Sequence, residues 1–92
     1  MLDTEAIESI GRLVRRPFRH RMEGDRCVEL DLTSEFDPYQ GLIRHLDPQE
    51  KQAVLTLVGR LEGLRVLNLR CNLLGDIGPM LGRLRELEHL NL

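Results

Sequence analysis

The sequence predicts an α/β fold, a short solenoid with a helical N-terminal cap, about three parallel strands on its concave face and one helix on its convex side. Leucine fills 19 of the 92 positions, and 13 of these leucines lie within residues 54–92. The segments 64–69 and 87–92 follow one leucine pattern at a spacing of 23 residues. Two further segments, 3–14 and 48–61, carry apolar residues at helical spacing. A regular array of strands and helices explains all three observations.

The first helix is expected over residues 3–14, where the apolar side chains lie on one face. Asp3 or Thr4 is the expected N-cap, and Pro17 ends the helix because proline cannot continue its hydrogen bonds. The terminal coil of a stacked array exposes a core edge that must be covered. Residues 1–26 are therefore expected to form a helical N-terminal cap.

A first strand is expected over residues 27–32, because Leu30 and Leu32 at period two point to one face. The matching leucine of the next strand, Leu69, follows Leu32 after 37 residues rather than 23. The segment 27–63 is therefore either an irregular first repeat or a region that contains an unrelated edge strand.

The second helix is expected over about 48–61. Asp47 suits the N-cap, Pro48 suits the first helical position, and Glu50 completes a capping box. The apolar stripe that follows predicts a helix on the convex side, antiparallel to the strands, that closes a long first coil. A turn is expected before this helix, at residues 37–41.

The clearest repeat runs over residues 64–86. Its strand places Leu67 and Leu69 on the core face, and Asn72 follows where the chain must turn. A buried asparagine can bond to backbone groups that a turn leaves unpaired. The pattern resembles the leucine-rich repeat, in the variant common in plant-type and many bacterial repeats of 23–24 residues, with one extra glycine before the proline. The resemblance rests on Leu64, Leu67, Leu69, Asn72 and Leu74.

The resemblance implies a domain organisation and a structural role for Asn72, because this asparagine recurs in each coil of the family. The resemblance is specific over the C-terminal third and absent from the N-terminal segment. The implied parts are a cap over 1–26, an irregular first repeat over 27–63, a regular repeat over 64–86 and a truncated repeat over 87–92.

The resemblance also implies a non-catalytic protein–protein interaction module that binds a protein or peptide partner on its concave strand face. Parallel strands lie about 4.8 Å apart, so outward-facing residues of successive strands stack into rows. The alternative is that these residues only make the surface soluble. The expected rows are Glu29, Val66 and His89; Asp31, Asn68 and Asn91; and Thr33 and Arg70.

A basic segment at 15–21 offers an alternative function, binding to nucleic acid or to an anionic membrane surface. The net charge of −2 and the acidic residues near this segment favour a solvated loop instead, so neither partner is expected. The arginines concerned are Arg15, Arg16, Arg19 and Arg21, which surround Phe18.

Four leucines near the last residue are expected to face a core with nothing stacked upon them, namely Leu84, Leu87, Leu90 and Leu92. Exposed core edges of this kind mark interfaces. Two explanations follow: the chain is a fragment of a longer repeat protein, or it forms a homodimer through this open C-terminal end. A third alternative is a recognition module from a larger signalling or effector protein.

No catalytic residue, metal site or cofactor is expected. The three histidines are scattered, and no serine or cysteine stands in a recognised nucleophile context. Cys27 and Cys71 have no partners at metal-ligand spacing. The first ten residues carry acids where a signal peptide needs bases, and no apolar run approaches a membrane span of about 18 residues. A cytoplasmic location is therefore expected.

Overall fold

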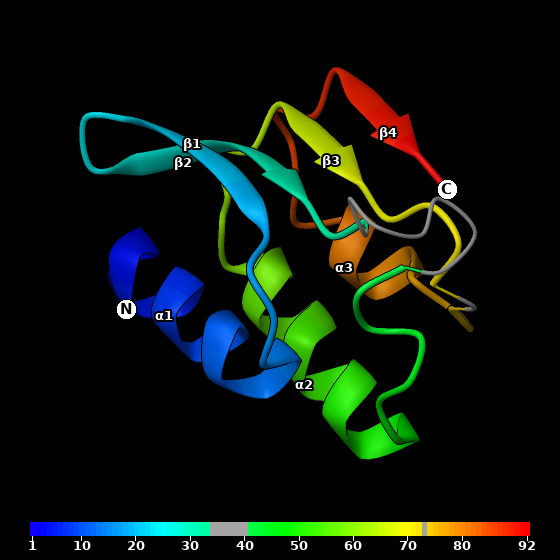
Figure 1. Ribbon diagram of the computed structural model, residues 1–92. Helices are drawn as coiled ribbons and strands as arrows, with labels where there is room; N and C mark the ends of the chain where they lie inside the picture. The colour runs from blue at the N-terminus through cyan, green and yellow to red at the C-terminus, as the bar shows by residue number, and fades with distance from the viewer. Residues whose placement is uncertain (34–40, 73) are drawn as a thin grey trace.

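A four-stranded mixed sheet with helices packed against one of its faces forms the fold in the computed structural model, which describes residues 1–33, 41–72 and 74–92 (Figure 1). The α/β class predicted from the sequence is confirmed. The helices are α1 (Asp3–Val14), α2 (Pro48–Gly59) and α3 (Gly78–Leu81), and the strands are β1 (Arg19–Glu23), β2 (Arg26–Asp31), β3 (Val66–Asn68) and β4 (His89–Asn91).

The sheet has the strand order β1-β2-β3-β4. The pairs β2–β3 and β3–β4 are parallel, as expected, whereas β1 pairs with β2 in an antiparallel hairpin. The hairpin turn contains Gly24 with φ of 61°, a left-handed conformation that glycine adopts without strain. The expectation of parallel strands alone is therefore incomplete.

Strand β1 corrects the prediction that residues 1–26 are helical and that 15–21 is a solvated loop. Four of its five side chains are exposed, and only Met22 is half-buried. An edge strand of this kind shows no alternation of apolar and polar residues, so its sequence carries no strand signal. The backbone pairing with β2 decides its conformation.

Helix α1 spans the predicted residues, but its cap differs from the prediction. Leu2 occupies the N-cap position, and its N–H donates to the Glu5 carboxylate at 3.1 Å. The Asp3 carboxylate instead accepts a hydrogen bond from the backbone N–H of Cys27 at 2.8 Å. This bond ties the first turn of α1 to the start of β2. The helix ends at Val14, and its C-cap residue, Arg15, has a left-handed φ of 63°.

Helix α2 begins as predicted. The Asp47 carboxylate accepts from the Glu50 N–H at 2.8 Å, and the Asp47 N–H donates to the Glu50 carboxylate at 3.3 Å. Both bonds of the capping box are therefore present. The helix ends at Gly59, slightly earlier than expected, and Arg60 and Leu61 form a turn bonded to its last carbonyl groups. Of the turn predicted at 37–41, all but Gly41 lies outside the described residues.

The core lies between the sheet and the helices. The buried side chains come from the three helices, from β2 and β3, and from the segments that follow β2, α2, β3 and α3. Those that are least exposed include Ile10, Val14, Leu30, Leu32, Ile43, Val54, Val58, Leu61, Leu64, Leu67 and Leu69. Aliphatic side chains thus form the centre of the core, in agreement with the leucine-rich composition.

Asn72 is buried and bonded to the backbone, as predicted. It is 1 % exposed, and its carbonyl oxygen accepts from the Ile43 N–H at 2.9 Å. Its amide donates to the carbonyl groups of Leu69 at 3.0 Å and Leu32 at 3.3 Å. A Cβ atom at Gly41 would lie 1.9 Å from the Asn72 side-chain oxygen, so the chain passes this amide closely. Asn72 therefore joins the turn after β3 to the segment after β2.

The four leucines near the last residue are not equally exposed. Leu84 is 4 % exposed and belongs to the core, which corrects the prediction for this residue. The turn after α3, with the Leu84 N–H bonded to the Leu81 carbonyl at 3.1 Å, returns this side chain to the core. Leu87 is half-buried, whereas Leu90 and Leu92 are 37 % and 62 % exposed. Self-association through these residues stays a prediction.

The described residues contain no helix with the length and apolar character needed to cross a bilayer. In the same part of the chain, no three His, Cys, Asp or Glu side chains come together in a way that would hold a metal ion.

Candidate functional site

The candidate site is the face of the sheet opposite the helices, called the open face (Figure 1). Side chains of successive strands form two rows across it. In register, the first row is Arg19, Asp31, Asn68 and Asn91, and the second is Arg21, Glu29, Val66 and His89. The alignment of β2, β3 and β4 predicted from the sequence is therefore confirmed, and β1 adds an arginine to each row.

The third predicted row, Thr33 and Arg70, lies just beyond the carboxyl ends of β2 and β3. The Thr33 N–H donates to the Asp31 carboxylate at 2.9 Å, and the Arg70 N–H donates to the side-chain oxygen of Asn68 at 3.1 Å. These equivalent bonds end the two strands in the same way. Asp31 and Asn68 thus have a structural role that the sequence-based assignment as binding residues omitted.

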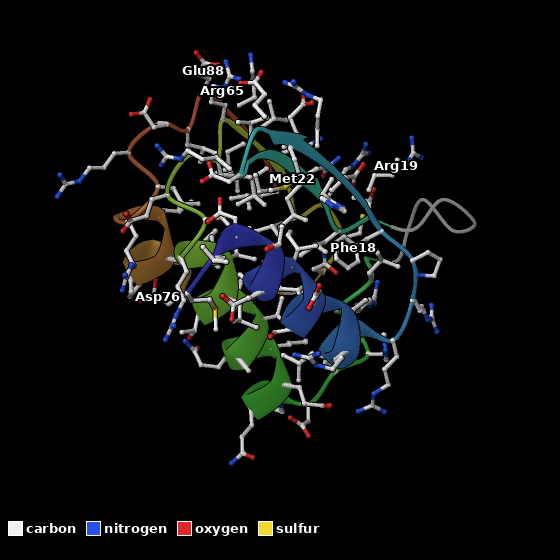
Figure 2. All side chains as sticks on the ribbon, turned by 90° about the vertical axis from the view of Figure 1, so that its left-hand side faces the viewer. Phe18, Arg19, Met22, Arg65, Asp76 and Glu88 are labelled. Atoms are coloured by element: carbon white, nitrogen blue, oxygen red, sulfur yellow. The ribbon has the colours of Figure 1, made fainter. Side chains whose placement is uncertain are left out.

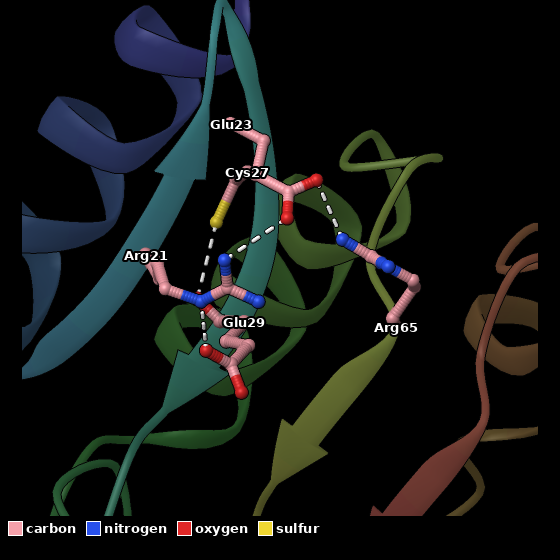
Figure 3. Close-up of polar contacts among 5 residues, drawn as sticks. All are labelled: Arg21, Glu23, Cys27, Glu29 and Arg65. Carbon is pink, nitrogen blue, oxygen red and sulfur yellow. Dashed lines mark hydrogen bonds and ion pairs between the residues drawn. The ribbon is translucent and has the colours of Figure 1, made fainter.

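Ion pairs connect β1, β2 and the residue that precedes β3 (Figure 3). Arg21 on β1 bonds to Glu29 on β2 and, at 3.0 Å, to Glu23. Glu23 also bonds to Arg65, the residue before β3, at 2.6 Å. Sequence reasoning missed Glu23 and Arg65, because they are distant in sequence and come together only through the pairing of β2 with both β1 and β3.

The charges in this network support one another. Hydrogen bonds from Arg21 and then Arg65 lower the pKa of Glu23 below its ordinary value. Hydrogen bonds to Glu29 and then Glu23 raise the pKa of Arg21. All of these side chains are at least partly exposed, so the ion pairs add little to the free energy of unfolding. Their main effect is to fix the orientation of Arg21.

A shallow hollow of about 270 Å³ lies on the open face over β1, β2 and β3. Charged side chains surround it, and Val66 supplies apolar surface, whereas the side chain of Leu30 belongs to the core. A hollow of this size can take one or two side chains of a partner. Its lining residues are Arg19, His20, Arg21, Glu29, Leu30, Asp31, Val66 and Asn68.

The structure separates the four arginines of the basic segment. Arg15, at the end of α1, pairs with Glu50 of α2 at 2.9 Å, and Arg16 is exposed in the connection to β1. Arg19 and Arg21 lie on β1. Figure 2 shows Phe18 below β1 on the side of α1, where it packs against the core. The segment therefore does not form a continuous basic surface with an exposed aromatic ring.

The two cysteines lie in different surroundings. Cys27 is buried at the start of β2, and its thiol donates to the Glu29 carbonyl at 3.3 Å. Burial raises the pKa of the Cys27 thiol to about 11, so this group stays protonated at neutral pH. Cys71 is partly exposed and has a positive φ of 63° in the turn after β3.

Comparison of the chain with protein-family models, curated proteins and solved structures finds no match.

Proposed function

We propose that this chain is a non-catalytic binding module that takes a protein or peptide partner on the open face. The observation that carries the proposal is the one-sided sheet. The helices pack against one face, and the other presents three parallel strands with rows of polar and charged side chains in register. Side chains on strands are held in fixed relative positions, so they suit the recognition of a partner.

We also propose that the segment from β2 to β4 is a short leucine-rich-repeat solenoid. Two observations support this. The register of β3 and β4 follows the 23-residue period of the sequence, and Asn72 bonds to the backbone of two successive segments, as the repeat requires. Strand β1 pairs with the outer edge of β2, which is the place that a cap would occupy.

Selection from a random peptide display library on the immobilised full chain tests the binding function. Peptides that bind the open face should be enriched on the wild-type protein and should bind weakly to a double variant, Arg70→Ala with His89→Ala. Both side chains are exposed, so their loss should leave Tm unchanged. The control is Arg83→Ala with Arg85→Ala, two exposed residues that line a different hollow. If selected peptides bind the face variant and the wild type equally, the open face is not the site.

A further inference from the structure

We propose that the partner of the open face is an acidic peptide whose carboxylates are held over β3 and β4. This inference rests on the proposed function, because it names the chemistry of the partner at that same site. The inference follows from an unequal distribution of acidic side chains across the sheet. Among the described residues, the acidic side chains of the two rows are Glu29 and Asp31, and both lie on β2.

These two acids already have partners within the chain. Glu29 is bonded to Arg21, and Asp31 accepts from the backbone N–H of Thr33. Arg19 and Arg21 lie beside Asp31 and Glu29 in register, so the positive and negative charges on the β1 and β2 side of the open face are equal in number. A partner gains little by replacing bonds that the protein already makes.

The β3 and β4 side presents hydrogen-bond donors instead. The guanidinium group of Arg70 and the imidazole of His89 are exposed and make no hydrogen bond or ion pair with the described residues. The oxygen of Asn68 already accepts from the Arg70 N–H, so its amide NH₂ group remains for a ligand. Asn91 lies next to Asn68 in register and is exposed.

Carboxylates are the complement of this group of donors. Arginine binds a carboxylate through two parallel N–H bonds, and such charge-assisted bonds are about twice as strong as neutral ones. Val66, half-buried and adjacent to His89 in register, borders the hollow of about 270 Å³. This hollow can take an apolar side chain next to an acidic residue of the same peptide.

A peptide fits these observations better than a nucleic acid. Because Glu29 and Asp31 stand beside the arginines of β1, the open face offers no continuous basic surface to a polyanion. Binding of single-stranded nucleic acid also depends on exposed aromatic rings, and the phenylalanine among the described residues, Phe18, packs against the core. A peptide places its carboxylates only where its sequence has them.

Fluorescence polarisation with three labelled peptides tests the proposal on the full chain. The probe is Gly-Glu-Val-Glu-Val-Glu-Gly, and its counterparts carry Gln or Lys in place of Glu. The Glu peptide should bind about tenfold or more tightly than the Gln peptide, and added salt should weaken its binding. Arg70→Glu should weaken binding of the Glu peptide by about tenfold or more, and His89→Ala should weaken it by a smaller factor.

The matched control is Arg85→Glu, which makes the same change of charge at an exposed arginine outside the open face. It should change the affinity by less than about twofold. Equal binding of the Glu and Gln peptides, unchanged affinity in Arg70→Glu, or tighter binding of a uridine oligonucleotide with the same number of charges would each overturn the acidic specificity. None of these results decides the proposed function itself, since the library selection tests the open face without assuming the charge of the partner.

Discussion

Strands β3 and β4 carry the same leucine pattern and pair in register, but β3 is covered much more completely on its core side. Leu67 on β3 is 1 % exposed, and its partner Leu90 on β4 is 37 % exposed. The following leucines differ even more, with Leu69 at 1 % and Leu92 at 62 %. The pattern therefore decides which side chains point inward, whereas the layer packed against the strand decides how far they are buried.

Two differences in the surroundings accompany this contrast. Strand β3 lies between two neighbours, whereas β4 is at the edge of the sheet. Helices α1 and α2 have 12 residues each and pack against one another beneath the sheet, whereas α3 has four. Because a longer helix covers more apolar surface, the stabilisation from equivalent leucines should fall from β3 to β4. This comparison gives four predictions.

Removal of a core leucine should have the largest effect. Leu67→Ala should lower the free energy of unfolding by about 3 kcal/mol, because the deletion leaves a cavity in a packed core. Leu90→Ala should lower it by less than about 1 kcal/mol, because that side chain already contacts water. Urea denaturation of the two variants measures both values. Equal losses would show that β4 is covered as well as β3.

Removal of the buried Asn72 side chain should have the second-largest effect on stability. Asn72→Ala should cost about 2 kcal/mol, because it leaves the Ile43 N–H and the Leu69 carbonyl without their partner in a buried place. The exposed Asn91 offers a control, and Asn91→Ala should change the stability by less than about 0.5 kcal/mol. Thermal and urea unfolding check both. A tolerated Asn72→Ala would remove the main structural support for the repeat proposal.

A smaller loss of stability is expected from changes at the carboxyl ends of β2 and β3. Asp31→Ala and Asn68→Ala should each cost about 1 kcal/mol, because each removes an acceptor from a backbone N–H just beyond a strand. Chemical denaturation and amide exchange of Thr33 and Arg70 measure the effect. Faster exchange of these two amides, without faster exchange in β4, would locate the loss at the strand ends. Unchanged exchange would contradict the assigned role.

The smallest effect on stability is expected when the ion pairs of β1 are removed. The pKa of Glu23 is lowered below its ordinary value of 4.5, so its contribution to stability is present above that pH and is lost as the pH falls through the lower value in the folded protein. Between neutral pH and about pH 3, Tm of the wild type should therefore fall slightly more than Tm of Glu23→Gln. Parallel slopes for the two proteins would contradict a coupled role for Glu23.

Local signals in the sequence predicted the elements that depend on neighbouring residues. Asp47, Pro48 and Glu50 predicted the start of α2, because a capping box is formed within one turn. The leucine period predicted the alignment of β3 with β4, and the place of Asn72 in the repeat predicted its burial. These features recur in the chain or lie within a few residues.

The parts that were not predicted depend on distant contacts. Asp3 does not cap its own helix because its carboxylate reaches the N–H of Cys27. The charged segment of β1 becomes a strand because the edge of β2 accepts its backbone. Of the open face, the rows on β2, β3 and β4 were predicted, whereas the arginines that β1 adds and the pairing of Glu29 with Arg21 were not.

The sequence by itself determined the α/β class, the inward side of each leucine-bearing strand and the position of the buried asparagine, because periodicity and capping are properties of short segments. The tertiary structure alone decided the mixed sheet, the unequal burial of equivalent leucines and the charge balance of the open face. These features depend on which distant segments meet, and a hydrogen bond or ion pair forms only when folding brings its two partners together.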